Sequence, residues 1–167
     1  VNPTRVYGPG PVNESNSVTR MISMYARGRW RIIPGDGTCV GNYVLIDDVV
    51  RGHIQAALKG RAGHRYILGG DNITFDQFFE TLADLTGKRR WLIRFPVSLM
   101  TVVARVMEWQ AGITGIAPLI TAPWVKKYLN HWSLSSRKAR EDLGINPVSF
   151  AEGAKITLDW LRESGKA

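Results

Sequence analysis

Apolar side chains recur with helical spacing in several separate parts of the chain. Intervals of three and four residues place such side chains on one face of a helix, and that face is then expected to be buried. The spacing predicts helices over residues 16–27, 47–59, 74–86, 96–111, 118–130, 136–143 and from residue 150 onward. In the first two of these helices, the faces predicted to be buried are Val18, Met21, Ile22 and Tyr25, and Val50, Ile54, Ala57 and Leu58. In the helices that start at residues 74 and 150, they are Phe75, Phe78, Phe79, Leu82 and Leu85, and Phe150, Ala154, Leu158 and Leu161. Trp132 is also interpreted as a core aromatic.

Short apolar runs lie between these segments and predict strands. They cover residues 1–7, 30–33, 42–46, 65–68 and 91–95, and turns rich in glycine and proline separate several of them. Strands alternate with helices over the first 95 residues, which predicts an α/β fold with parallel pairing, whereas the rest is mostly helical. These strands are too few for a complete doubly wound sheet. We therefore expect them to complete a sheet whose first strands lie upstream of Val1.

Polar side chains mark the predicted starts of three helices. Asp47 or Asp48 is expected to cap the second helix, because a carboxylate accepts free backbone N–H groups and suits the positive end of the helix dipole. The segments Thr74–Gln77 and Ser149–Glu152 have the spacing of a capping box, which predicts that each opens a helix.

The composition is that of an ordinary globular protein. The chain has 167 residues, 44% apolar and 22% charged, which suits one domain or part of a larger one and excludes a disordered tail. Lys and Arg number 22 against 14 Asp and Glu, so the net charge is +8. The basic clusters at 27–31, 88–90 and 126–127 are short and far apart, and no nucleic-acid-binding signature accompanies them. We interpret them as solvated faces rather than a nucleic-acid interface, and some of these cations remain candidates for contact with an anionic cofactor or substrate.

Several other kinds of site are disfavoured by the sequence. The single cysteine, Cys39, cannot form an internal disulfide, which favours a reducing, cytoplasmic compartment. Charged residues interrupt the longest apolar stretch, so no membrane span is expected. The three histidines lack the spacing of metal ligands, so no metal is expected either.

Four segments, in order, resemble the extended and atypical short-chain dehydrogenases, in particular the group of dihydroflavonol reductases and sugar epimerases. They are Asn-Pro-Thr-Arg-Val-Tyr-Gly-Pro-Gly at residues 2–10, Gly-Asp-Gly at 35–37 with Asn-Tyr-Val-Leu-Ile-Asp-Asp-Val at 42–49, Tyr-Ile-Leu-Gly-Gly-Asp-Asn-Ile-Thr-Phe at 66–75, and Ser-Arg-Lys-Ala-Arg-Glu-Asp-Leu-Gly at 136–144. The resemblance implies the C-terminal part of a Rossmann-like doubly wound sheet plus a smaller, mostly helical substrate-binding lobe. We expect residues 1–70 to carry the last elements of the sheet with part of the lobe, and residues 71–167 to form the rest of the lobe.

The resemblance also implies a cofactor, NAD or NADP, and assigns part of its site to this chain. By that resemblance, Asn2, Pro3, Thr4 and Arg5 lie against the nicotinamide end of the cofactor. The locked φ of a proline presets the path of the neighbouring backbone groups, and a threonine can add a hydroxyl. The substrate contacts expected beside them are Val6, Tyr7, Gly8 and Tyr43.

The family's reactive residues are missing from these 167 residues. None of the Gly-x-Gly pairs leads into a helix as the phosphate-binding turn does. The nearest approach to the family's Tyr-x-x-x-Lys pair is Tyr25 with Arg29, and we interpret Tyr25 as a core or interface aromatic. We therefore expect a C-terminal piece of a longer enzyme that is inactive alone, has no catalytic residues of its own, and depends on a missing N-terminal half. A homodimer remains possible.

Three functions stay open. The first is the cofactor- and substrate-binding portion of an NAD(P)-dependent oxidoreductase that acts on a small-molecule carbonyl or alcohol. The second is the same portion of a nucleotide-sugar epimerase or dehydratase. Gly41 stands where such epimerases carry an arginine for the diphosphate, which favours an apolar or aromatic substrate instead, unless Arg20 or Arg140 supplies that charge. The third is a dehydrogenase-like module that binds dinucleotide without turnover.

Overall fold

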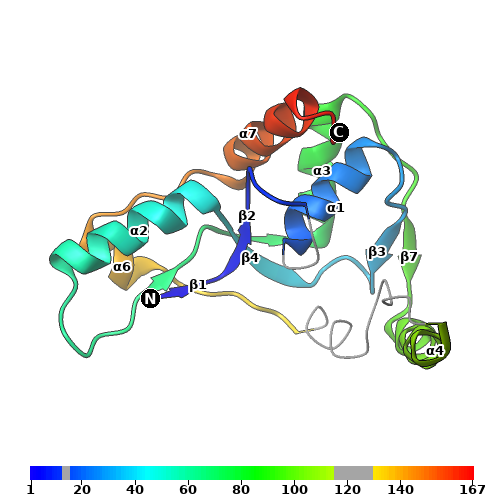
Figure 1. The fold of residues 1–167 in the computed structure, drawn as a ribbon, viewed down its shortest axis with the longest axis horizontal. Coiled ribbons are helices and arrows are strands. Elements are labelled where there is room, and N and C mark those ends of the chain that lie inside the picture. Colours follow the sequence, from blue (N-terminus) through cyan, green and yellow to red (C-terminus); the bar gives the residue numbers. More distant parts are fainter. Residues whose placement is uncertain (13–15, 115–129) are drawn as a thin grey trace.

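The protein is an α/β structure in which short strands cross the centre and helices pack around them (Figure 1). The computed structural model describes residues 1–12, 16–114 and 130–167. The strands are β1 (Asn2–Pro3), β2 (Arg5–Tyr7), β3 (Ile32–Pro34), β4 (Val40–Leu45), β5 (Ile67–Leu68), β6 (Asp71–Thr74) and β7 (Ile93–Phe95). The helices are α1 (Ser17–Ala26), α2 (Ile46–Lys59), α3 (Phe75–Thr86), α4 (Val97–Thr114), α6 (Arg137–Leu143) and α7 (Phe150–Glu163). The helix expected at 118–130 lies almost entirely outside the described residues.

The strands form one small three-stranded sheet and two separate pairs. The sheet has the order β2-β4-β6, and the pairs are β1 with β5 and β3 with β7. β2 is parallel to β4, β1 is parallel to β5, and β3 is parallel to β7. These three pairings confirm the predicted parallel arrangement. β6 runs antiparallel to β4 and was not predicted, because its polar residues Asp71 and Asn72 follow a glycine turn and give no strand pattern.

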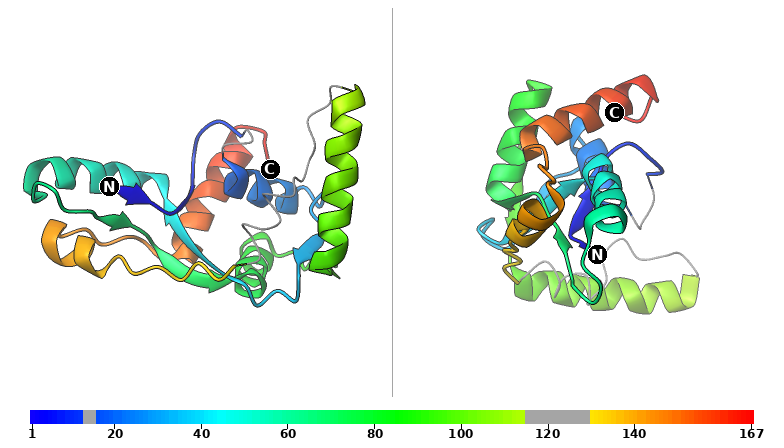
Figure 2. Two further views of the ribbon diagram at one scale, coloured as in Figure 1. Left: turned by 90° about the horizontal axis from the view of Figure 1, so that it is seen from below. Right: turned by 90° about the vertical axis from the view of Figure 1, so that its left-hand side faces the viewer.

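The larger core lies between the central sheet and the helices α1, α3 and α7. Figure 2 shows these helices in the middle of the molecule, between α2 and α6 at one end and α4 at the other. Aromatic rings dominate it. The ring centroid of Phe78 lies 4.8 Å from that of Phe150 and 5.2 Å from that of Tyr43. Burial of each such ring contributes about 1.5–3 kcal/mol before the entropic cost. Tyr25 is 1% exposed in this core, as its interpretation as a core aromatic predicted.

A second, smaller core joins α2 and α6 to the other end of the sheet. Its buried members are Val44, Val49, Tyr66, Leu68, Ala139 and Leu143. The larger core draws on residues from both sides of position 70. The expected division of the chain at residue 70 stays a prediction.

The predicted capping boxes do cap helices. In α3, the Thr74 hydroxyl accepts from the Gln77 N–H at 3.1 Å, and the Gln77 side chain accepts from the Thr74 N–H at 2.9 Å. In α7, the Ser149 hydroxyl accepts from the Glu152 N–H at 3.3 Å. These contacts satisfy backbone donors that have no partner inside the helix.

The prediction for α2 was wrong about both its cap and its buried face. The helix begins at Ile46 with Leu45 as the capping residue, so Asp47 and Asp48 lie in its first turn. Its predicted buried face is exposed: Val50 by 50%, Ile54 by 53% and Leu58 by 73%. The opposite face packs inward because Gly52 permits a close approach, since a Cβ there would lie 2.7 Å from methyl groups of Leu68.

Two shorter expectations also need correction. Residues 1–7 were predicted to form one buried strand, but they form two strands interrupted at Thr4, and Asn2 and Pro3 are exposed. Trp132 was predicted to be a core residue, yet it is 44% exposed.

Helix α4 stands at the edge of the molecule, beside β3 and β7 (Figure 2). It begins one residue later and ends three residues later than the sequence predicted. Its inner side carries the buried Met100 and Ala104. Within the described segments, no helix combines the length and the apolar character that a membrane crossing needs.

Candidate functional site

A small pocket lies where β1 passes into β2. It has a volume of about 200 Å³ and is lined by Pro3, Thr4, Arg5, Asn42, Trp132 and Leu134. The structure thus brings together three of the four residues assigned to the cofactor. The fourth, Asn2, lies exposed on β1 next to it.

Asn42 holds this pocket together through its side-chain amide. Its Oδ1 accepts from the Thr4 hydroxyl at 2.7 Å and from the Gly70 N–H at 3.1 Å. Its Nδ2 donates to the Gly70 carbonyl at 3.0 Å and to Asn72 Oδ1 at 2.8 Å. Asn42 is 1% exposed, so these partners replace water and fix the orientation of the amide. Sequence reasoning missed this role, although an asparagine inside an apolar strand was a signal of a satisfied polar network.

One wall of the pocket comes from a distant segment, residues 131–134. The backbone N–H of Trp132 donates to the Val40 carbonyl at 2.9 Å. Leu134 and Asn72 exchange two hydrogen bonds, each 3.0 Å long. These bonds hold residues 131–134 alongside β4 and β6. Trp132 therefore lines the same pocket as Pro3 and Thr4. The expectation of a core position for Trp132 failed because its ring packs at the pocket rather than in the interior.

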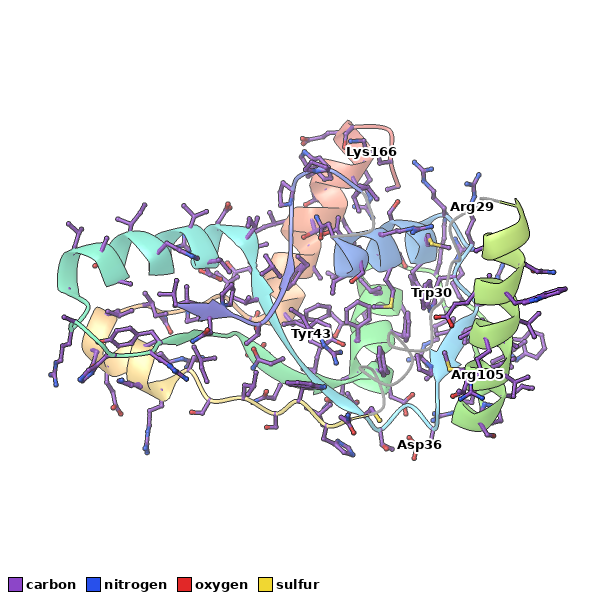
Figure 3. The ribbon with its side chains drawn as sticks, turned by 60° about the horizontal axis from the view of Figure 1, so that its bottom comes forward. Arg29, Trp30, Asp36, Tyr43, Arg105 and Lys166 are labelled. Carbon is purple, nitrogen blue, oxygen red and sulfur yellow. The ribbon has the colours of Figure 1, made fainter. Side chains whose placement is uncertain are left out.

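The guanidinium of Arg5 is fixed against Tyr43. Arg5 Nη1 donates to the Tyr43 hydroxyl at 3.2 Å, and the guanidinium carbon lies 5.5 Å from the centre of that ring. The absence of a side chain at Gly41 makes room for this arrangement, because a Cβ there would lie 2.5 Å from Arg5 Nη1. The guanidinium of Arg5 thus occupies the space that a side chain at position 41 would fill, and it is held there by Tyr43. Figure 3 shows Tyr43 in the interior, where its ring contacts Phe78.

The residues predicted to contact substrate are divided between a second pocket and the core. Val6 and Tyr7 line a pocket of about 260 Å³ around the turn that Gly8 opens. The Gly8 N–H donates to the Thr19 hydroxyl at 3.0 Å, which fixes the turn on α1. Tyr43 is buried and lines neither pocket. Substrate contact by Val6, Tyr7, Gly8 and Tyr43 stays a prediction.

Tyr7 is not suited to proton transfer near neutral pH. It is 1% exposed, and its hydroxyl donates to the Phe150 carbonyl at 3.5 Å. Burial, followed by the negative charges of Asp71 and Asp48, raises the pKa of Tyr7 well above its ordinary value. The phenol therefore stays protonated and acts as a core residue.

Two carboxylates beside Tyr7 fix the start of α7. Asp71 Oδ2 accepts from the Phe150 N–H at 2.8 Å, at the positive end of that helix. Asp48 Oδ2 accepts from the Val148 N–H at 3.0 Å, and its other oxygen pairs with Arg51. Both contacts join segments far apart in the sequence, so we interpret these aspartates as structural.

Other reactive residue types do not gather into a site. Among the residues that the structure describes, no group of His, Cys, Asp and Glu could hold a metal ion. Burial raises the pKa of the Cys39 thiol, which lowers its thiolate fraction and its reactivity. Five of the residues assigned to cofactor and substrate line the two pockets along β1 and β2.

Comparison with known proteins identifies the segment that carries these pockets. Residues 1–69 match the sequence model of the NAD dependent epimerase/dehydratase family. This match agrees with the resemblance of the same segment to the extended short-chain dehydrogenases. All eight residues assigned to cofactor and substrate lie within this family segment.

Curated relatives extend the similarity to nearly the whole chain. Short-chain dehydrogenase/reductase family 42E member 1 of Danio rerio is 30% identical over 99% of this chain and 44% of its own length. Sterol demethylase protein B of Methylococcus capsulatus is 29% identical over 99% of this chain and 50% of its own. The 3beta-hydroxysteroid-dehydrogenase/decarboxylase isoform 1 of Arabidopsis thaliana is 27% identical over 95% and 39%. The chain thus spans about half the length of the curated relatives it matches.

Solved structures confirm the Rossmann-like α/β class of the epimerase/dehydratase family. The crystal structure of gox2253 matches with a TM-score of 0.75 and 29% identity, over 99% of this chain and 49% of that one. A UDP-glucose 4-epimerase from Thermotoga maritima, solved with UDP-glucose, matches with a TM-score of 0.71 and 29% identity, over 97% and 45%. A dTDP-glucose 4,6-dehydratase from Streptomyces venezuelae with NAD bound matches with a TM-score of 0.64 and 25% identity, over 96% and 42%.

Proposed function

We propose that these 167 residues supply the nicotinamide-side wall of an NAD(P)-dependent oxidoreductase that acts on a hydroxyl or carbonyl group of an apolar substrate. The observation that carries the proposal is the pocket of about 200 Å³ that Pro3, Thr4, Arg5 and Asn42 line inside the family segment. When bound, the cofactor supplies hydride transfer.

The pocket fits one end of a dinucleotide better than the whole of it. Sites for drug-sized ligands enclose roughly 300–1,000 Å³, so about 200 Å³ suits a single ring with a small polar group. A nicotinamide carboxamide needs one acceptor and one donor at fixed positions. The N–H groups of Asn2 and Thr4 are bonded to β5, and alternation along the strand turns the Pro3 carbonyl to the opposite edge. That carbonyl and the Thr4 hydroxyl oxygen, whose proton goes to Asn42, are the two acceptors that we assign to the NH2 group of the carboxamide.

The rest of the reaction needs residues that this chain does not contain. The sequence holds neither a glycine-rich turn leading into a helix nor a Tyr-x-x-x-Lys pair. We propose that a dinucleotide-binding half supplies both, and that it covers the exposed edge of β1 and β2 together with the apolar face of α2. The relatives, about twice as long as this chain, support such an arrangement. The division at residue 70 belongs to the same proposal.

An apolar substrate agrees best with the surroundings of Gly41. No side chain there reaches toward a diphosphate, and Arg5 is held by the Tyr43 hydroxyl. The names of two relatives, a hydroxysteroid dehydrogenase and a sterol demethylase protein, support a hydroxylated ring compound as the substrate class. The likeness to UDP-glucose 4-epimerase favours the second candidate, epimerisation of a nucleotide sugar.

The test measures NAD(P)H absorbance with the polypeptide that the complete reading frame encodes. A sterol alcohol and UDP-glucose serve as the two substrates. Two results together support the proposal: the parent protein turns over the sterol, and Thr4→Val slows that turnover roughly three- to tenfold. This factor corresponds to the loss of one hydrogen bond. Thr81→Val on the outer side of α3 serves as the matched control. Turnover of UDP-glucose alone favours the epimerase, and cofactor binding without any turnover favours a non-catalytic module.

A further inference from the structure

Three arginines line a further pocket, between α3 and the loop that joins α3 to β7. This pocket has a volume of about 360 Å³. Its lining includes Arg89, Arg90 and Arg94, and the first two belong to one of the basic clusters of the sequence. Figure 1 shows α3, β3 and β7 on the side of the molecule away from α2 and α6. The pocket shares no lining residue with the pocket at Thr4.

Arg90 carries hydrogen-bonding capacity that the described residues do not use. Its Nη2 donates to the Ala26 carbonyl at the end of α1, at 3.0 Å. Its Nε is buried and has no hydrogen-bond partner among the described residues. No carboxylate in this part of the chain forms an ion pair with Arg90, whereas Arg89 and Arg94 each have one. Buried donors without an acceptor are rare in native proteins, so this group indicates a place where an acceptor from outside the chain is accommodated.

The guanidinium of Arg90 is held in place from two sides. The Tyr25 hydroxyl accepts from the Arg90 backbone N–H at 3.5 Å and donates to the Lys88 carbonyl at 3.1 Å, which fixes this loop on α1. Gly28 has a φ of 71° and no side chain, and a Cβ there would lie 3.0 Å from Arg90 Nη1. The cation is therefore positioned before any ligand arrives, which lowers the entropic cost of binding.

The acids at the pocket select the charge of its ligand. Arg94 pairs with Asp76 at 3.0 Å, whereas Arg89 lies 3.9 Å from Glu80 with side chains that are 81% and 65% exposed. Such a long, exposed pair contributes little, so Arg89 can turn to a second anion. The two carboxylates repel each further negative charge. They favour a ligand with a single charge, a carboxylate that a guanidinium binds through two oxygens, over a doubly charged phosphate.

The buried side of the pocket is apolar. Tyr25, Ile33 and Phe79 line it and are at most 7% exposed, and Leu92 extends the same surface. A volume of about 360 Å³ lies within the range of roughly 300–1,000 Å³ that small-molecule sites enclose. A bare inorganic anion would leave most of this space and its apolar lining uncovered. A ring or a short hydrocarbon chain attached to the charged group would fill it.

We propose that this pocket binds a small molecule in which one carboxylate is joined to an apolar group. The carboxylate accepts hydrogen bonds from the guanidinium groups of Arg90 and Arg89, and the apolar group packs on Phe79 and Ile33. Binding here does not depend on a bound cofactor, because the two pockets have no lining residue in common.

The experiment is calorimetric titration of the polypeptide that the complete reading frame encodes, with phenylbutyrate as the probe. We expect saturable binding of phenylbutyrate. Phenylbutanol, which keeps the carbon skeleton without the charge, and inorganic phosphate, which keeps a charge without the ring, should each bind at least about tenfold more weakly. Arg90→Gln should weaken phenylbutyrate binding about tenfold. Arg137→Gln removes an equal charge from the exposed side of α6 and should leave binding unchanged.

A second variant is expected to act in the opposite direction, which loss of folding cannot imitate. Glu80→Gln removes one repulsion and frees Arg89, so it should tighten phenylbutyrate binding about two- to fivefold. Glu163→Gln, at an exposed position at the end of α7, is its control and should have no effect. Failure of phenylbutyrate to bind, or equal binding of the acid, the alcohol and phosphate, would overturn the proposal. Equal affinities in Arg90→Gln and Arg137→Gln would do the same.

Discussion

Single polar groups in the interior decide how the pocket is held. Asn42 joins β4, the Gly70 turn and Thr4 with one amide, whereas the apolar residues around it only fill space. Removing such a group lowers the free energy of unfolding by more than one hydrogen bond contributes. Its former partners remain buried and have no other hydrogen-bonding group to replace it.

Asn42→Ala should lower the free energy of unfolding by about 2–4 kcal/mol, since it leaves the Gly70 N–H and carbonyl without their partner. Urea denaturation of the chain measures this loss. Asn146→Ala, at an exposed position, is the control and should change stability by less than about 0.5 kcal/mol. A loss for Asn42→Ala as small as that of the control would show that the network is not essential.

Tyr7 makes stability depend on alkaline pH. Its pKa is higher in the folded state than the ordinary value of about 10, so the folded state holds the phenol proton more tightly. The resulting stabilisation is complete below pH 10 and falls by about 1.4 kcal/mol for each pH unit above it. Tyr7→Phe should therefore lose less stability than the parent between about pH 9 and pH 11. Parallel loss in both proteins, measured by urea denaturation, would contradict the burial argument.

At the scale of elements, the sequence predicted more about the existence of helices than about their surroundings. The faces of α1, α3 and α7 were correct, because one apolar row in each meets an apolar partner. The row on α2 was equally regular, yet it is exposed, since periodicity says which side chains share a face and not what covers it. β6 escaped prediction because hydrogen bonding to β4, rather than any apolar alternation, defines it.

The exposed row of α2 gives a prediction of its own. Leu58→Asp should change the free energy of unfolding of the 167-residue chain by less than about 0.5 kcal/mol, because the side chain is 73% exposed. It should also reduce self-association in sedimentation velocity runs. Leu143→Ala, in the core between α2 and α6, is the contrasting variant and should cost about 2–5 kcal/mol. A large loss for Leu58→Asp would mean that the row is covered within this chain.

The candidate site was predictable only in part. Pro3, Thr4 and Arg5 were assigned through the resemblance of their segment, and the structure brings them to one pocket. Asn42, Trp132 and Leu134 complete it, but their positions depend on strand register and on a segment that lies ninety or more residues beyond Asn42. The position of Arg5 over Tyr43 likewise depends on the space at Gly41, which only coordinates reveal.

For the whole molecule, the central feature is the contrast between well-formed cores and an open edge. Two apolar cores fix the helices around the strands, while β1, the outer row of α2 and the pocket at Thr4 face outward. Relatives about twice as long contain further chain that this sequence does not align with. We therefore propose that these residues form one wall of a cofactor site.

Calorimetric titration with NAD tests that account most directly. It compares the 167-residue chain with the polypeptide encoded by the complete reading frame. We predict saturable binding only in the complete polypeptide, weakened roughly three- to tenfold by Thr4→Val and unchanged by Thr81→Val. Tight binding by the 167 residues alone would contradict the account, as would a failure of Thr4→Val to weaken binding in the complete polypeptide.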